Sequence, residues 1–134
     1  MPDTVMASPL VDNKFNNITK VFEHYTSGAL TTGTAKYEWI IPFYGRILDI
    51  IIDSETAATG QDDDIIDINL DGTTIFTTQA NRPRLVSNNT GQWSHTKPDV
   101  ETVVPGQVLS YDVDQVGSGA GSQRVKVTIL FGAR

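Results

Sequence analysis

Few side chains in this sequence could support catalysis. The chain has two histidines, His24 and His95, and no cysteine, which excludes a cysteine nucleophile and a thiolate zinc site. A Ser-His-Asp arrangement would have to combine His95 with one of many serines and aspartates, and the sequence contains no G-x-S-x-G nucleophile motif. Because His95 lies between Ser94 and Thr96, we expect it in a surface loop. The sequence therefore predicts that the protein is not an enzyme.

Three consecutive aspartates, at positions 62 to 64, form the one dense carboxylate cluster. Carboxylate oxygens are ligands for Ca²⁺, and Gln61 and Asp67 could add to Asp62 and Asp64. The spacing differs from that of an EF-hand loop, and alternate residues of a strand point to opposite faces. The other interpretation is a solvated loop whose charge discourages edge-to-edge aggregation. We predict no cofactor and no metal, with Asp62 and Asp64 as the calcium candidates.

Aromatic and basic side chains supply the remaining candidate binding residues. Trp93 and three of the tyrosines could form a platform for a sugar, although aromatic side chains serve equally in cores and interfaces. Arg82 and Arg84, on either side of Pro83, are the nearest approach to a basic cluster. We therefore name Trp93, Arg82 and Arg84 as candidate ligand or interface residues.

The charge of the chain excludes several classes of partner. The net charge is −6, and the ten Lys and Arg residues are scattered. Binding to phosphates requires clustered Lys and Arg, so neither nucleic acid nor a membrane surface is an expected partner. The first residues lack the pattern of a signal peptide, and no apolar run reaches membrane-spanning length. We expect synthesis in a cytoplasm.

The segments that carry these candidate residues alternate apolar and polar side chains, as strands do. No stretch of a dozen residues has the apolar spacing of three and four that a long amphipathic helix requires. The most apolar stretch, residues 37–53, is predicted to be a hairpin whose first strand ends at Pro42. Its second strand is expected to turn Leu48, Ile50 and Ile52 to the core.

Further strands are predicted on both sides of this stretch. Asp71-Gly72 is the strongest two-residue hairpin signal in the chain. Residues 26–34 are expected to be a flexible connection, and residues 79–98 a long irregular segment with a short strand at Leu85 and Val86. The other predicted strands are 21–25, 64–70, 73–77, 100–104, 109–113 and 125–131, of which the last is expected to be central in its sheet.

The fold class is therefore predicted to be all-β: an antiparallel β-sandwich of the jelly-roll type with an extended N-terminal arm. An immunoglobulin-like sandwich is the alternative. Residues 1–35 are assigned to the arm and first strand, and residues 36–134 to the sandwich. The first 17 residues are either a frayed terminus or an arm that becomes ordered on a partner. The expected contact residues of such an arm are Val5, Met6, Leu10, Val11 and Phe15.

Three motifs resemble those of small structural proteins of tailed phages. They are W-x-x-P-F-x-G-R-I-x-x-I from Trp39, D-I-N-L-D-G-T-T-I-F from Asp67, and G-Q-V-L-S-Y-D-V-D-Q-V-G-S from Gly106, which is closed by R-V-K-V-T-I-L. The chain thus resembles the jelly-roll domains of head decoration (cement) proteins and related tail and fibre domains. The resemblance covers residues 37–134 and transfers no catalytic residues.

This resemblance implies a location and a function. It implies a homotrimer on the outer capsid surface of the virion, bound to the major capsid protein and stabilising the shell. The N-terminal arm would then reach neighbouring capsid subunits. The alternative function is a receptor- or carbohydrate-binding module of a tail tip or fibre, with Trp93 in an exposed aromatic patch.

Overall fold

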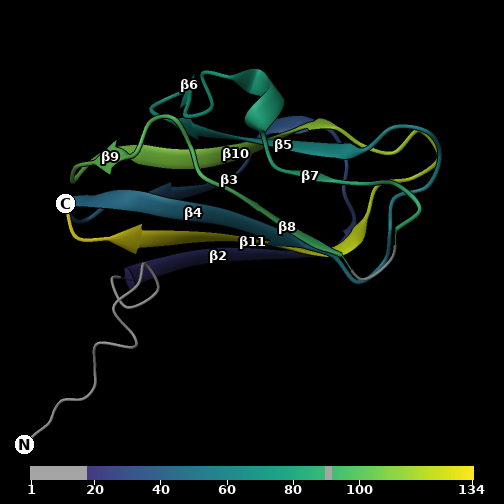
Figure 1. Cartoon of the computed structure of the whole chain (residues 1–134), viewed down its shortest axis with the longest axis horizontal. Helices are drawn as coiled ribbons and strands as arrows, with labels where there is room; N and C mark the ends of the chain where they lie inside the picture. Colours follow the sequence, from purple (N-terminus) through teal and green to yellow (C-terminus); the bar gives the residue numbers. More distant parts are fainter. Residues whose placement is uncertain (1–17, 90–91) are drawn as a thin grey trace, which may run out of the picture.

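Two antiparallel sheets pack face to face in the computed structural model, which describes residues 18–89 and 92–134 (Figure 1). In the first sheet, the order is β2 (Ile18–Ala29), β11 (Gln123–Gly132) and β4 (Gly45–Asp53), and β4 also pairs with β8 (Trp93–Thr96) and β9 (Thr102–Val103). In the second sheet, the order is β3 (Gly33–Ile40), β10 (Val108–Gln115) and β5 (Asp64–Leu70), and β5 also pairs with β6 (Thr73–Thr74) and β7 (Arg84–Leu85). The predicted all-β sandwich is confirmed.

The pairing of the strands is that of a jelly roll. Each of the first four long strands pairs with a late strand: β2 with β11, β3 with β10, β4 with β8 and β9, and β5 with β6 and β7. The pairs formed by β2 and β4 lie in the first sheet, and those formed by β3 and β5 lie in the second. Successive pairs along the chain therefore alternate between the two sheets, as in a long antiparallel hairpin that is wrapped into a barrel. An immunoglobulin-like sandwich would instead pair its first two strands within one sheet, whereas β2 and β3 lie in different sheets.

The predicted hairpin over residues 37–53 is wrong, although its strands exist. β3 lies in the second sheet and β4 in the first, so the connection over residues 41–44 is an arch between the sheets. Ile41 inside the arch is fully buried, and its backbone N–H and C=O bond to Gln107 and Gly106. Pro42 ends β3 as predicted, because proline offers no N–H to a ladder.

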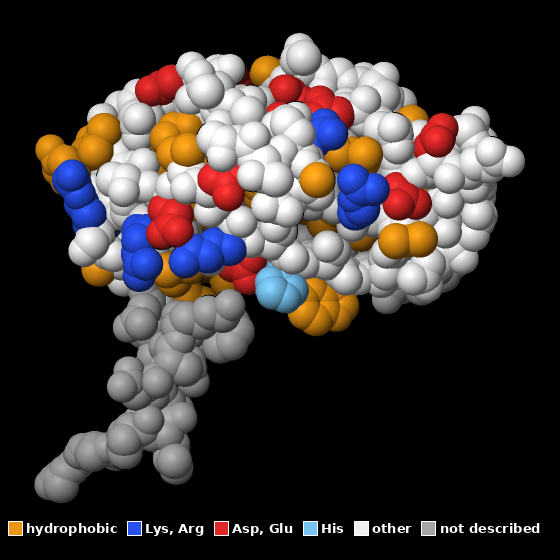
Figure 2. Space-filling view, turned by 45° about the horizontal axis from the view of Figure 1, so that its top comes forward, with side chains coloured by type: hydrophobic (Ala, Val, Ile, Leu, Met, Phe, Trp, Pro, Cys, Tyr) orange, Lys and Arg blue, Asp and Glu red, His pale blue; other side chains and the backbone are white. Residues whose placement is uncertain are grey.

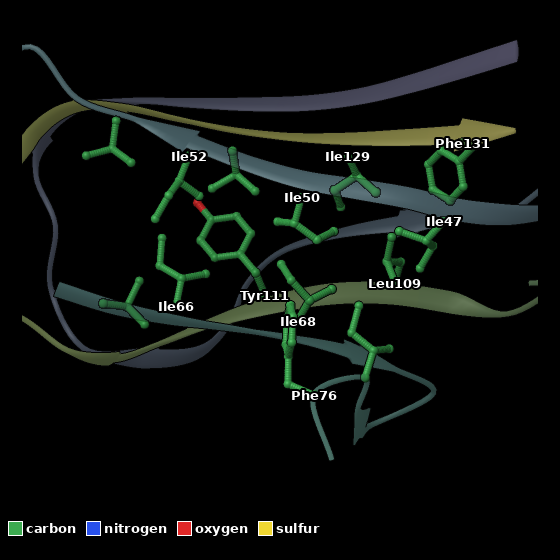
Figure 3. Close-up of a cluster of buried hydrophobic side chains, with 14 of the residues drawn as sticks. Ile47, Ile50, Ile52, Ile66, Ile68, Phe76, Leu109, Tyr111, Ile129 and Phe131 are labelled. Atoms are coloured by element: carbon green, nitrogen blue, oxygen red, sulfur yellow. The ribbon is translucent and has the colours of Figure 1, made fainter. Parts of the chain in front are cut away.

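The core positions of β4 also differ from the predicted alternation. The register of β4 against β11 shifts so that Leu130 faces Asp49 and Phe131 faces Ile47. Ile47, Ile50 and Ile52 therefore enter the core cluster (Figure 3), whereas Leu48 is buried outside it. A bulge of this kind changes which face a side chain occupies.

Several predicted elements are confirmed. The strand over residues 64–70 is β5, and the hairpin turn at Asp71-Gly72 has positive φ values of 51° and 83° at its two residues. β11 is central, between β2 and β4, and its alternate residues Val125, Val127, Ile129 and Phe131 lie in the core.

Other segments differ from the prediction. The expected flexible connection over 26–34 is largely strand, because β2 continues to Ala29 and β3 begins at Gly33. The irregular segment 79–98 contains the edge strand β8, which places His95 in a strand and not in a loop. It also contains a short 3₁₀ helix, Gln79–Asn81. The predicted division into residues 1–35 and 36–134 stays a prediction, and β2, within the first range, pairs along β11.

An aromatic cluster fills the side of the sandwich between the edge strands β2 and β3. Phe22 stacks on Trp39 with their ring centroids 5.8 Å apart, and His24 stacks on Tyr37 at 4.1 Å. The hydroxyl of the buried Tyr111 lies 2.8 Å from His24 Nδ1. Burial lowers the pKa of His24, because desolvation penalises its charged form.

Candidate interaction surfaces

The predicted arm residues Val5, Met6, Leu10, Val11 and Phe15 lie outside the described residues. The first described residue, Ile18, pairs with Gly132 of β11. Residues 1–17 therefore join the sandwich at the end where β11 finishes. Their contact with a partner stays a prediction.

Basic side chains gather at this end of the first sheet. We name Lys20, Tyr44, Arg46, Lys97 and Arg134 the basic end. Lys20 pairs with Phe131, and Arg46 pairs with Gly132, so β2 and β4 both bring a cation to the end of β11. Figure 2 shows Lys and Arg side chains beside hydrophobic ones at the end of the molecule that carries the C-terminus in Figure 1.

The charges of the basic end are only partly neutralised. Arg46 and Lys97 share one carboxylate, that of Glu101, at N–O distances of 3.7 and 3.3 Å. The Arg134 guanidinium lies 5.5 Å from the ring centroid of Tyr44, whose side chain is 64% exposed. This end therefore presents an exposed aromatic ring together with an excess of positive charge.

The outer face of the second sheet carries a hollow of about 580 Å³. Glu38, Ser110 and Asn69 lie side by side across β3, β10 and β5 in the register of the strands. We name the hollow, whose lining includes Glu38, Asn69, Asp71, Val108, Ser110 and Asp112, the acidic hollow. Its acidic residues come from β3, β10 and the β5–β6 turn, so the sheet positions them rather than one segment of sequence.

Hydrogen bonds fix two of these carboxylates. Asp112 accepts hydrogen bonds from the backbone N–H of Ala35 at 2.8 Å and from Nδ2 of Asn69 at 2.9 Å. Asp71 accepts one from the backbone N–H of Val108 at 2.9 Å. Within the described residues, the Glu38 carboxylate forms no hydrogen bond or ion pair. A carboxylate offers about four lone-pair sites, so all three can accept further donors.

Asp67 adds to the negative potential beside the hollow. It pairs with Asp112 in the register of β5 and β10. Burial raises the pKa of Asp67, although a hydrogen bond from the Thr74 hydroxyl at 2.6 Å opposes this effect. The predicted ligand residue Arg82 bonds to the neighbouring Asp114 at 2.6 Å.

The three candidate ligand residues do not form one site. Trp93 lies on β8 in the first sheet, is 64% exposed and stacks on His95 with a centroid distance of 5.5 Å. Arg84 lies on β7 in the second sheet, 3.7 Å from Asp63. Trp93 therefore belongs to a different sheet from both Arg84 and the Asp114 partner of Arg82.

The two calcium candidates have different environments. Asp62 is exposed. Asp64 is fully buried, and its two oxygens accept hydrogen bonds from the backbone N–H groups of Gly117 and Ser122, each at 3.0 Å. Asp64 therefore anchors the loop between β10 and β11. In residues 18–89 and 92–134, no group of three or more His, Cys, Asp or Glu side chains is arranged to hold a metal ion.

The histidines have structural partners. His95 Nδ1 lies 2.9 Å from the carboxylate of the buried Asp49, and His24 contacts Tyr111. In the part of the chain that the structure describes, neither histidine is hydrogen-bonded to a serine or threonine hydroxyl. No helix there has the length and apolar character needed to cross a membrane.

Sequence reasoning missed the acidic hollow and the basic end. Asp112, Asp67 and Asn69 are recognisable as outward polar positions of their strands, but the sequence does not show that these strands are neighbours. The basic end unites residues that are up to 114 positions apart, from Lys20 to Arg134. Spatial clusters of this kind become visible only once the strand order is known.

Comparison with known proteins gives one informative similarity. No protein-family model matches the chain, and no curated protein matches it. Among solved structures, the chain is similar to a chain of the "Cyanophage Pam1 capsid asymmetric unit", with a TM-score of 0.54 and 16% sequence identity. The similarity covers 98% of this chain and 94% of that chain. It shows that the two chains share one fold over nearly their whole length.

Proposed function

We propose that this protein is a non-enzymatic structural protein of a phage virion, which binds the outside of the capsid as a trimer and stabilises the shell. The observation that carries the proposal is the likeness, over nearly the full length of both chains, to a chain of a cyanophage capsid asymmetric unit. The jelly-roll topology supports it, because the sequence motifs resemble those of decoration proteins that use this fold.

The architecture suits a mechanical function. Both sheets contribute to one continuous core, and Ile18, the residue that follows the proposed arm of residues 1–17, lies at one end of the sandwich next to Gly132. In the proposed complex, this segment contacts the major capsid protein through its apolar residues. Each contact can be weak, since many copies on a closed shell give avidity.

The test compares the full chain with a variant that lacks residues 1–17. Both are mixed with shells assembled from the major capsid protein of the phage that encodes the chain, and bound protein is measured after sedimentation. The full chain is expected to sediment with the shells and to raise their resistance to heat, and the shortened chain to bind at least about tenfold more weakly while keeping its thermal midpoint. A full chain that stays in the supernatant would refute the proposal.

A second candidate function rests on Trp93. An exposed tryptophan stacked on His95 is the kind of platform that binds a sugar ring, so a receptor- or carbohydrate-binding module of a tail tip or fibre is the alternative. A glycan array is the test. Saturable binding that is lost in Trp93→Ala, with the fold intact, would favour this function over capsid binding.

A further inference from the structure

The basic end and the acidic hollow have opposite charge and lie on different parts of the sandwich. The basic end is formed where β2, β4 and β11 of the first sheet meet, together with the arch residue Tyr44. The acidic hollow lies on the outer face of β3, β10 and β5 in the second sheet. Within the described residues, no ion pair joins a cation of the basic end to a carboxylate of the acidic hollow, so the two surfaces do not neutralise each other within one molecule.

We propose that the basic end of one copy docks into the acidic hollow of a second copy, so that copies of this chain join head to tail in a closed ring. The expected number of three copies rests on the proposed function, whereas the contact itself rests on the two surfaces described above. A contact between two different patches is heterologous, and it generates a ring when the rotation closes.

The chemistry of the two surfaces is complementary. A guanidinium presents several N–H donors in a planar fork that matches a carboxylate, and Arg134 and Arg46 supply two such groups at the basic end. In the hollow, Glu38 forms no internal ion pair within the described residues, and Asp71 and Asp112 have acceptor capacity beyond their hydrogen bonds.

The size of the hollow is also compatible with an exposed aromatic side chain. Tyr44 is 64% exposed at the basic end, with the Arg134 guanidinium against its ring. The hollow of about 580 Å³ lies within the range of about 300–1,000 Å³ of pockets that bury drug-sized ligands. Val108 and Ala35 give part of its lining an apolar character that can contact an aromatic ring. Exposed aromatic and arginine side chains are the groups that most often anchor protein interfaces.

Within the described residues, neither Arg82 nor Lys36 forms an ion pair with Glu38 or Asp112. The Arg82 guanidinium is held by Asp114 at 2.6 Å, and the Lys36 amine donates to the Thr31 hydroxyl at 2.9 Å. Glu38 and Asp112 therefore remain available for a cation from another molecule. The remaining cations of the described residues include Arg124, which lies 3.9 Å from Glu55 at the opposite end of β11 and makes a matched control.

The test is charge reversal on each surface, followed by light scattering after size-exclusion chromatography of the full chain. Glu38→Arg changes the hollow, Arg134→Glu changes the basic end, and Arg124→Glu is the control. Each single reversal is expected to weaken the trimer about tenfold or more, as close charge pairs across interfaces do. The double variant Glu38→Arg/Arg134→Glu is expected to recover the trimer at least in part, because it exchanges the two charges. Urea midpoints of the variants at low concentration establish that each monomer is folded.

The outcomes separate this inference from the proposed function. A wild-type protein that is monomeric or dimeric, or single reversals that leave a trimer as strong as that of the control, would overturn the head-to-tail contact. Sedimentation with shells is measured on the same samples. If the protein binds shells but the charge reversals do not change trimer formation, the head-to-tail contact is wrong and the proposed function is supported. If the charge reversals weaken the trimer but the protein does not bind shells, the head-to-tail contact is supported and the proposed function is wrong.

Discussion

Replacing Asp64 by alanine is expected to destabilise the protein strongly, although Asp64 is not part of any interaction surface. Asp64 is 0% exposed, and its two carboxylate oxygens accept the backbone N–H groups of Gly117 and Ser122 at 3.0 Å each. These two residues lie near the two ends of the loop that leads from β10 into β11, the central strand of the first sheet. The carboxylate therefore fixes how one sheet passes into the other.

The magnitude follows from the two donors that the substitution leaves without an acceptor. A buried donor without a partner costs about 1–3 kcal/mol, so the loss of an acceptor for two donors in Asp64→Ala is expected to lower the free energy of unfolding by about 2–6 kcal/mol. Asp64→Asn keeps one carbonyl oxygen and replaces the other by an NH₂ group that faces a donor, so we expect a loss of about 1–3 kcal/mol. Asp62→Ala, two positions away and exposed, is expected to change stability by less than about 0.5 kcal/mol.

Urea unfolding followed by circular dichroism is the assay, at one fixed protein concentration because an oligomer adds to apparent stability. With a slope of about 2 kcal/mol per M, Asp64→Ala should lower the midpoint by about 1–3 M. A change below about 1 kcal/mol for Asp64→Ala would refute the assigned role. Millimolar calcium is expected to leave the wild-type midpoint unchanged, since both Asp64 oxygens are committed to backbone donors. A calcium-dependent rise would revive the metal hypothesis.

Three further predictions concern the body of the sandwich. His24 has a lowered pKa, so the unfolded chain binds a proton more readily than the folded one. Stability should therefore fall as the pH drops below the unfolded value of about 6.5 until the folded pKa is passed. The urea midpoint, measured from about pH 8 to about pH 5, should therefore change less with pH in His24→Gln than in the wild-type protein. Gly121→Ala should lower the thermal midpoint sharply, because its Cβ would overlap a backbone carbonyl oxygen, whereas Gly28→Ala meets nothing within 4 Å and should change little. Ile50→Ala, at a fully buried site, should cost about 2–5 kcal/mol in urea unfolding, while Ile40→Ala, which is 71% exposed, should cost less than about 1 kcal/mol. Equal effects in either matched pair would contradict the burial described here.

The sequence predicted strands well where one face is buried and the other is polar. β5 and β11 alternate with a period of two residues, and the Asp71-Gly72 turn has the residue types that positive φ requires. The alternation does not identify the partner of a strand, and for that reason β3 and β4 were predicted to pair with each other. The edge strand β8 was missed because its short sequence, WSHT, has neither length nor aliphatic residues.

The interaction surfaces could be predicted only in part. Trp93 was named from its residue type, and its exposure is a fact of the structure. Asp62 and Asp64 were treated as similar because they are neighbours in sequence, yet one is exposed and the other buried, since only Asp64 lies within β5. The acidic hollow depends on the order of β3, β10 and β5, which no local pattern encodes.

The place of β11 between β2 and β4 has a consequence for how the protein is made. β2 pairs only with β11 in the described sheet, and the partners Ile18 and Gly132 are separated by nearly the whole chain. During translation, β2 and β4 are made long before β11, so the edges with which they pair along β11 stay unpaired until residues 123–132 are made. Such non-local pairing makes folding slow and exposes the nascent chain to aggregation. The first sheet can therefore be completed only once residues 123–132 have been made, and recombinant yield should depend on temperature and chaperone supply more than on the stability of the finished fold.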